Sequence, residues 1–231
     1  MRPRAIVLLS AGLDSTVNLV LALEQADVIL ALTFDYGQLA ARRESELAKA
    51  ITARYYLEHR VIDLPFLKTN YSALTGSRDG LPSVEESALE DKALMSKNAA
   101  LVWVPNRNGV FVNVAAAVAE ANATELIVAG FNAEEAITFA DNSREFITAS
   151  NKVLSLSTRL PVTLVSYTAD LEKTAIVRLG LSKKAPLDLV WACYAGGEIM
   201  CGQCESCRRL IRAFRNAGVL DLLRGRIEIS C

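Results

Sequence analysis

Apolar and polar residues follow two different periodicities along this chain. Five short, mainly apolar runs are typical of buried strands and occupy residues 5–9, 28–34, 60–64, 126–129 and 160–165. Apolar positions at helical spacing occupy residues 17–23, 44–56, 111–121 and 171–177. Strands and helices in this alternating order predict a parallel sheet with right-handed crossovers. We therefore expect an α/β fold, built on a doubly wound parallel five-stranded sheet.

Two segments interrupt this alternation. Residues 65–100 break it with Gly76, Gly80 and Pro82, and we expect an irregular excursion or a lid that orders on ligand binding. Residues 130–146 follow the fourth predicted strand and contain several acidic and amide side chains. Ligands of doubly wound sheets bind beyond the carboxyl ends of the strands. This segment could therefore hold Mg²⁺ or read a base, although ordinary turns use the same residues.

The turn after the first predicted strand has the features of an anion-binding site. Its sequence, Ser-Ala-Gly-Leu-Asp-Ser-Thr at residues 10–16, links a strand to a helix. Unpaired N–H groups and the helix dipole attract anions there, and Gly12 lets a ligand approach the backbone closely. The hydroxyl groups add donors, and Asp14 could hold the Mg²⁺ that accompanies a polyphosphate. Without a ligand, Gly12 only makes the turn, and Asp14 or Ser15 only caps the helix.

Two cationic side chains later in the chain could meet the same anion. Arg107 stands just before a buried helix, and its planar guanidinium suits a phosphate or a carboxylate. Its neighbour Asn108 would serve equally as a helix cap. Lys173 falls in the first turn of the last predicted helix, where the helix dipole disfavours a cation. A lysine makes sense there if it faces an anion, although solvated surface lysines are common.

Four cysteines near the end of the chain have the spacing of a metal site. They follow a C-x7-C-x2-C-x2-C pattern and are Cys193, Cys201, Cys204 and Cys207. Tight C-x2-C hooks deliver four thiolates to tetrahedral zinc, and such a closed site is structural. An iron–sulfur cluster, two disulfides or unligated thiols are the alternatives. Cys231 lies outside this set. We expect a nucleotide-binding domain over residues 1–185 and a small helical zinc-binding subdomain over residues 186–231.

Composition narrows the class of protein further. The chain of 231 residues has 25 basic and 26 acidic side chains, which argues against direct binding of nucleic acid over a large surface. No run approaches the ~18 apolar residues of a membrane span. The residues after the basic amino terminus argue against a signal peptide. We expect a cytoplasmic protein that binds no membrane, in which the one histidine, His59, is structural.

Taken together in chain order, these motifs resemble one family, the 7-cyano-7-deazaguanine synthases of queuosine-type deazapurine biosynthesis. That family belongs to the PP-loop (N-type) ATP pyrophosphatase superfamily, whose fold is adenine nucleotide alpha-hydrolase-like. Ala11 stands in place of the first glycine of the superfamily's Ser-Gly-Gly-x-Asp-Ser loop. The matching residues cover nearly the whole chain and are Ser10–Ser15, Phe34–Gln38, Val104–Asn108, Asp141–Phe146, Lys173, Cys193–Tyr194 and Cys201–Cys207.

The resemblance implies an ATP-dependent carbon–nitrogen ligase. Such an enzyme converts 7-carboxy-7-deazaguanine and ammonia to the nitrile through an acyl-adenylate and an amide, and releases AMP and pyrophosphate. Catalytic roles are implied for Asp14, Lys173 and Arg107. The implied contacts of ATP, pyrophosphate and their Mg²⁺ are Ser10, Ala11, Gly12, Leu13, Asp14, Ser15, Thr16, Thr33 and Phe34. The implied contacts of the deazapurine are Tyr36, Gln38, Arg107, Asn108 and Asp141. A structural Zn²⁺ on the four cysteines and a homodimer complete what the resemblance implies.

Two segments depart from the family's usual sequence. Leu39-Ala40 stands where Arg-His is usual, and Thr138–Ser143 replaces a Ser-Gly-Tyr-Pro-Asp-type segment. Three alternatives therefore stay open. The protein could adenylate another deazapurine or use another acceptor amine, it could be a PP-loop enzyme that acts on tRNA, or it could be a non-enzymatic zinc-knuckle binding module.

Overall fold

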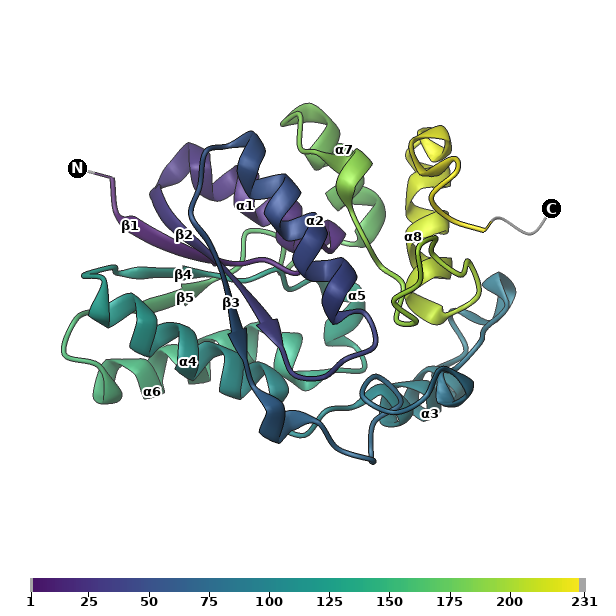
Figure 1. Ribbon diagram of the computed structural model, residues 1–231, viewed down its shortest axis with the longest axis horizontal. Helices are drawn as coiled ribbons and strands as arrows, with labels where there is room; N and C mark the ends of the chain where they lie inside the picture. The colour runs from purple at the N-terminus through teal and green to yellow at the C-terminus, as the bar shows by residue number, and fades with distance from the viewer. Residues whose placement is uncertain (1, 229–231) are drawn as a thin grey trace.

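The computed structural model, which describes residues 2–228, contains one five-stranded parallel sheet (Figure 1). The strand order is β3-β2-β1-β4-β5, which confirms the predicted doubly wound α/β fold. The chain passes outward from β1 to β3 on one side and through β4 to β5 on the other, so the order reverses between β1 and β4. Ligands bind at such a switch point. The strands are β1 (Arg4–Leu8), β2 (Asp27–Asp35), β3 (His59–Asp63), β4 (Leu126–Val128) and β5 (Thr163–Val165).

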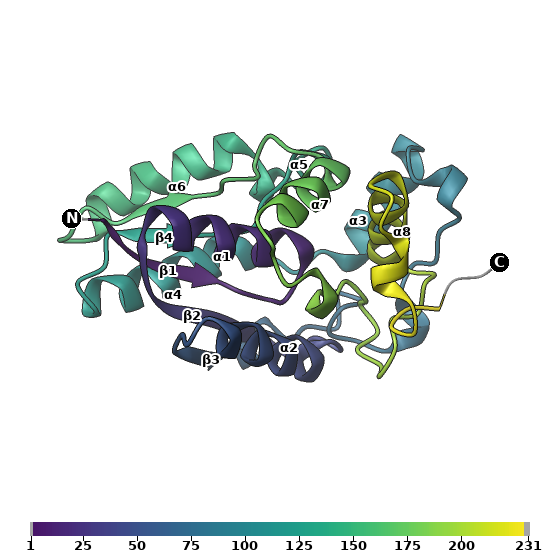
Figure 2. The ribbon, with the colours of Figure 1, turned by 90° about the horizontal axis from the view of Figure 1, so that it is seen from above.

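Helices cover both faces of this sheet, as the two perpendicular ribbon views show (Figure 2). One face is covered by α1 (Leu13–Gln25), α2 (Ala41–Arg54) and α7 (Lys173–Ser182). The other face is covered by α4 (Arg107–Ala121) and α6 (Arg144–Ser157). Helices α1 and α2 follow the carboxyl ends of β1 and β2, and α4 and α7 begin at Arg107 and Lys173, which line the same cavity. Several helix starts therefore gather around the switch point.

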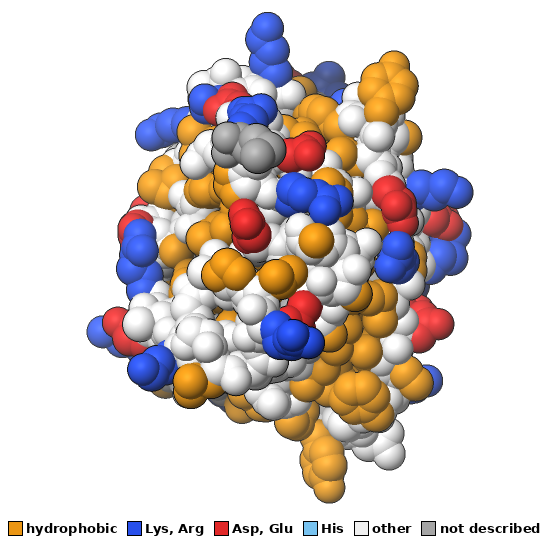
Figure 3. All heavy atoms as spheres, turned by 90° about the vertical axis from the view of Figure 1, so that its left-hand side faces the viewer, with side chains coloured by type: hydrophobic (Ala, Val, Ile, Leu, Met, Phe, Trp, Pro, Cys, Tyr) orange, Lys and Arg blue, Asp and Glu red, His pale blue; other side chains and the backbone are white. Residues whose placement is uncertain are grey.

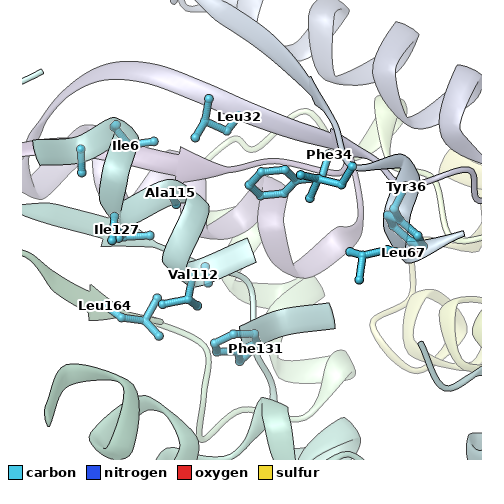
Figure 4. Close-up of a cluster of buried hydrophobic side chains, with 14 of the residues drawn as sticks. Ile6, Leu32, Phe34, Tyr36, Leu67, Val112, Ala115, Ile127, Phe131 and Leu164 are labelled. Atoms are coloured by element: carbon cyan, nitrogen blue, oxygen red, sulfur yellow. The ribbon is translucent and has the colours of Figure 1, made fainter. Parts of the chain in front are cut away.

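The alternation of side chains along β1 divides the core into two layers. Ala5 and Val7 are fully buried among residues of α1 and α2. Ile6 points the opposite way and packs with Val112 and Ala115 of α4 (Figure 4). Burial of each large aliphatic side chain contributes about 1.5–3 kcal/mol. Because both faces of the strand are apolar, the strand reads as a continuous apolar run in the sequence.

Three further helices lie at the carboxyl end of the sheet, and they are α3 (Lys92–Val102), α5 (Ala133–Ala136) and α8 (Glu205–Asn216). The prediction that residues 65–100 lack regular structure is wrong for their last part. Asp91 caps α3 by accepting hydrogen bonds from the N–H groups of Ala93 and Leu94. That cap gives the helix a firm start, although its apolar residues show little helical periodicity.

The segment before α3 is docked on α8. The N–H of Val84 donates to the carbonyl of Gln203 (3.1 Å), and Arg208 Nε donates to the carbonyl of Val84 (3.2 Å). The apolar face of α8 belongs to one buried core cluster together with residues of α1 and α7. This cluster includes Phe214 of α8, Leu21 of α1 and Ile176 of α7. A boundary between residues 185 and 186 therefore stays a prediction, while the core itself is continuous across it.

Neither a membrane-spanning helix nor, on the face opposite α8, a charge of one sign is present among the described residues. Among residues 2–228, no helix is long and apolar enough to cross a bilayer. On the face opposite α8, Lys and Arg side chains are interspersed with Asp and Glu (Figure 3). Extended binding of a phosphate backbone favours a basic face instead.

Gly130, just after β4, lets the loop before α1 approach the sheet edge closely. A Cβ atom at this position would lie 2.4 Å from the backbone nitrogen of Ser15 and 2.8 Å from the carbonyl carbon of Asp14. Contacts this short with backbone atoms require the loop or the strand end to move. Gly130 therefore holds the first loop against the end of β4.

We predict that Gly130→Ala lowers the free energy of unfolding by about 1–3 kcal/mol, because the added methyl group overpacks the backbone of the loop. Urea denaturation measures this change. Gly80→Ala is the matched control, since its Cβ would meet only Ala73 Cβ at 3.7 Å, and it should stay within about 0.5 kcal/mol of the wild type. Equal stability of both variants would contradict the close approach at Gly130.

Candidate functional site

A cavity of about 240 Å³ opens at the switch point, beyond the carboxyl ends of β1, β2 and β4. Its floor is the loop at residues 10–15, and an aromatic wall is formed by Phe34 and Phe111, whose rings stack at 4.3 Å. Arg107 and Lys173 enter from the starts of α4 and α7. The structure therefore brings the predicted anion loop and both predicted cations to one cavity.

The loop on the floor is held by its own hydroxyl groups. Ser15 Oγ donates to the carbonyl of Gly12 (3.2 Å) and accepts a hydrogen bond from the N–H of Ser10 (3.3 Å). Gly12, the N-cap of α1, has no side chain to cap the first N–H groups of the helix, and Gly12 to Ser15 line the cavity. Ala11 has a left-handed backbone (φ 59°), a conformation that favours glycine. Thr16 is fully buried behind the loop.

Lys173 is buried between two carboxylates. Its Nζ lies 2.9 Å from Asp14 Oδ2 and 2.7 Å from Glu135 Oε1, and its side chain is 8% exposed. Burial alone would lower the pKa of Lys173, but Asp14 and Glu135 outweigh burial and raise it. The ammonium therefore stays charged at neutral pH.

Asp14 retains one oxygen atom that is available to a ligand. Its Oδ2 accepts hydrogen bonds from Lys173 and from Asn132 Nδ2 (3.1 Å), whereas its buried Oδ1 has no partner among residues 2–228. Burial raises the pKa of Asp14 despite the opposing attraction of Lys173, and the second carboxylate, Glu135, adds to the rise. The cluster is thus short of positive charge. A carboxylate oxygen in such a place fits a hard divalent cation such as Mg²⁺.

Arg107 is a partly buried guanidinium that forms no salt bridge with a carboxylate in the described part of the chain. Its Nη1 donates to Tyr36 Oη (3.3 Å), and its Cζ lies 5.8 Å from the centre of the Tyr36 ring and 5.9 Å from that of Phe111. Its Nε is buried with no hydrogen-bond partner within residues 2–228. A buried polar atom is ordinarily hydrogen-bonded, so the unpartnered Nε leaves an open place for an anion.

Two predicted contact residues, Thr33 and Gln38, do not line the cavity. Thr33 Oγ1 donates to the carbonyl of Leu9 (2.5 Å) and bonds with His59 Nε2 (2.8 Å), which gives both residues a structural role. Gln38 Nε2 donates to the carbonyl of Phe34 (3.0 Å) and so fixes the loop after β2. Asn108 Nδ2 donates to the carbonyl of Asp141 (3.1 Å). Asn108 itself lines the cavity.

Asp141 lies beside the cavity wall, and its neighbour Asn142 is the residue that lines it. The segment at Leu39-Ala40, where the sequence departs from the family, lies against the backbone of Gly196. That departure is therefore accommodated by a close approach to the cysteine-containing unit. Neither Leu39 nor Ala40 lines the cavity.

A smaller cavity of about 120 Å³ adjoins the first. Phe139 and Glu205 line only the smaller one. The sequence analysis assigned no role to Tyr194, although this residue stood in a matched motif. It also missed Glu135 as a site residue, and the two acidic residues at 134–135 were the signal that could have indicated it. Both cavities share the lining residues Arg107, Glu135, Asn142, Tyr194 and Ser206.

The four predicted metal ligands come together. The sulfur atoms of Cys193, Cys201, Cys204 and Cys207 all lie within 4.8 Å of one another. The N–H of Cys201 donates to Cys193 Sγ (3.3 Å), and the N–H of Cys204 donates to Cys201 Sγ (3.4 Å). Four sulfurs around one point with N–H donors behind them fit tetrahedral zinc. Cys231 lies outside the described residues.

Comparisons with known proteins agree with this geometry. A family model described as "Queuosine biosynthesis protein QueC" matches residues 4–218. A protein named 7-cyano-7-deazaguanine synthase from Pelotomaculum thermopropionicum is 55% identical over 94% of this chain and 98% of its own. Proteins of the same name from Desulforudis audaxviator and Methanosarcina mazei are 53% and 42% identical, over 93% and 98% of this chain and 98% and 100% of their own. The chain belongs to the QueC family of queuosine biosynthesis proteins.

Proposed function

We propose that the protein is an ATP-dependent ligase that makes 7-cyano-7-deazaguanine from 7-carboxy-7-deazaguanine and ammonia. The observation that carries the proposal is Arg107, a partly buried guanidinium with an unpartnered Nε in the same cavity as the loop at residues 10–15. A guanidinium fork matches a carboxylate or a phosphate in two parallel hydrogen bonds. The names of the relatives at 40–55% identity support the choice of substrate.

The reaction consists of two activations. The substrate carboxylate attacks the α-phosphorus of ATP, pyrophosphate leaves, and ammonia then displaces AMP from the acyl-adenylate to give the amide. The amide oxygen attacks the α-phosphorus of a second ATP and a second pyrophosphate leaves, after which loss of AMP and of the two N–H protons gives the nitrile. The loop N–H groups at the start of α1 receive the departing pyrophosphate, while Lys173 and Arg107 stabilise charge near the α-phosphate. The loop therefore binds a leaving group.

The two adjoining cavities suit the two substrates, ATP and the deazapurine. The stacked rings of Phe34 and Phe111 form an apolar wall suited to adenine, next to the loop that takes the phosphates. The adjoining cavity, reached past Arg107 and Tyr194, takes the deazapurine. Mg²⁺ on Asp14 Oδ1 would supply positive charge to the polyphosphate. Zn²⁺ bound by the four cysteines would stabilise the fold of the C-terminal unit.

The remaining parts of the proposal follow from family membership. Free ammonia is the acceptor, the protein acts in the cytoplasm, and two copies form a homodimer. The near balance of 25 basic and 26 acidic side chains supports a small-molecule substrate over a tRNA substrate, because specific binding of RNA draws on phosphate contacts from a basic face. The residues that contact ATP and the deazapurine are part of the same proposal.

The direct test mixes the purified protein with ATP, Mg²⁺, ammonium and 7-carboxy-7-deazaguanine. Mass spectrometry should detect AMP, the amide and the nitrile, with two AMP formed for each nitrile. Omission of ammonium should stop the reaction before the amide. Formation of AMP without amide or nitrile would contradict the substrate assignment and keep the adenylation chemistry.

Arg107→Met should raise KM for the carboxylate substrate by roughly 30-fold, the equivalent of about 2 kcal/mol, because the carboxylate loses its charge-assisted hydrogen bonds to the guanidinium. The matched substrate is the amide intermediate, which carries no negative charge and should show a much smaller increase. Steady-state kinetics with each substrate separate the two. Equal increases for acid and amide would show that Arg107 does not bind the carboxylate.

Asp14→Asn and Cys204→Ser should separate chemistry from folding. Asp14→Asn lowers kcat by about 10²–10³-fold, because it removes charge at the reacting centre. Zinc content and melting temperature stay near those of the wild type, because Lys173 keeps its pair with Glu135 and the isosteric amide carries no charge to bury. Cys204→Ser lowers the zinc content and the melting temperature together, by roughly 5–10 °C or more, because metal binding is part of folding. Zinc analysis by mass spectrometry and calorimetry measure these changes. Stoichiometric zinc in Cys204→Ser would remove that residue from the ligand set.

A further inference from the structure

Lys173 is held at both ends by two successive residues of α5. Glu135 Oε1 accepts a hydrogen bond from Lys173 Nζ (2.7 Å), and Glu134 Oε1 accepts one from the backbone N–H of Lys173 (2.8 Å). Glu172, the N-cap of α7, makes no side-chain capping bond within residues 2–228. Glu134 therefore takes the place of an N-cap from another element, and a carboxylate suits the positive end of a helix.

The second oxygen of Glu134 belongs to α8. Its Oε2 accepts hydrogen bonds from Arg212 Nη2 (2.9 Å) and Arg209 Nη1 (3.3 Å). The side chains of Glu134 and Arg209 are only 13% and 7% exposed. Arg209 is itself fixed by Glu205 (3.0 Å) and by the carbonyl of Leu89 (3.2 Å). Buried, charge-assisted hydrogen bonds of this kind have well-defined geometry.

The helix at the far end of this connection is the one that begins in the cysteine cluster. Cys204 is the N-cap of α8, and Cys207 lies in its first turn. Arg209 and Arg212 follow Cys207 on the same helix and donate hydrogen bonds to one oxygen of Glu134. The other oxygen of Glu134 accepts a hydrogen bond from the backbone N–H of Lys173. The path crosses from the C-terminal unit to the reacting centre through one carboxylate.

We propose that Glu134 is a positioning residue that couples the docking of α8 to the placement of Lys173. The proposal rests on the proposed role of Lys173 in stabilising charge near the α-phosphate. Glu134 fixes the position of Lys173 by accepting a hydrogen bond from its backbone N–H. Helix α8 in turn fixes the position of Glu134 through the hydrogen bonds that Arg209 and Arg212 donate to its second oxygen. A shift of α8 therefore moves the ammonium relative to Asp14 and the loop.

A purely structural ion pair would behave differently. Breaking a buried pair is destabilising wherever it lies, so a loss of stability alone does not distinguish the two roles. Arg212 gives the sharper test, because it is partly exposed (22%) and lines neither cavity. Arg215 offers the matched control on the same helix, since it pairs with Glu86 of the segment docked on α8. Both substitutions remove one arginine from α8, and only one of them touches Glu134.

The experiment compares Arg212→Met, Glu134→Gln, their double variant and Arg215→Met in the full-length protein. Arg212→Met and Glu134→Gln should each lower kcat for AMP formation by about 3- to 10-fold, with a much smaller change in KM for ATP. The double variant should lose little more than the stronger single variant, because both act through one contact. Arg215→Met should stay within about twofold, as expected for an exposed ion pair.

A second readout does not depend on turnover. Brief treatment with acetic anhydride, followed by peptide mass spectrometry, gives the rate at which Lys173 is acetylated. A pinned, paired ammonium reacts slowly, so the rate should rise in Arg212→Met and Glu134→Gln and stay unchanged in Arg215→Met. Equal rates in all variants, or an equal fall of kcat in Arg215→Met, would overturn the coupling. A wild-type protein that forms no nitrile would overturn the proposed function and leave the acetylation result to decide the coupling.

Discussion

The interaction on which this site depends is the burial of one ammonium, that of Lys173, between the carboxylates of Asp14 and Glu135. Lys173 and Asp14 are largely taken out of water, at 8% and 13% exposure, while Glu135 is 34% exposed. Burying a charge costs several kcal/mol, and only close pairing offsets that cost. Asp14 comes from the loop after β1, Glu135 from the segment after β4, and Lys173 from the start of α7. The cluster therefore forms only when all three are in register, and it ties the arrangement of the sheet edge to the chemistry.

The fold was readable from the sequence because its information is local. Each buried strand is a short apolar run, and the alternation of Ala5, Ile6 and Val7 between two helical layers needs no partner to be recognised. The loop at 10–16 and the cysteine spacing are local in the same way. By contrast, Thr33 reads as a ligand-edge residue, yet its hydroxyl is committed to Leu9 and His59. Which face a strand-end side chain takes is decided by neighbours that are distant in the chain.

The connections that the sequence could not show are those between remote charged residues. Nothing in the spacing of Arg209 indicates that it meets Glu134, 75 positions away, or that Glu86 meets Arg215. The segment before α3 looked irregular for the same reason, since its order comes from α8 and not from its own periodicity. In isolation such a segment has too few apolar contacts to hold a shape, and tertiary packing supplies what propensity lacks.

Ala11 shows that the first loop and the cysteine-containing unit constrain one another. Its left-handed backbone costs an L-residue roughly 1 kcal/mol or more, and its carbonyl accepts a hydrogen bond from the N–H of Trp191 (2.8 Å). Trp191 Nε1 in turn donates to the carbonyl of Cys193 (2.9 Å). A strained conformation persists when its surroundings over-determine it, and here the chain leading into the cysteine cluster supplies that constraint. The floor of the cavity is thus held from the C-terminal side, while Glu134 holds Lys173 from the same side through α8.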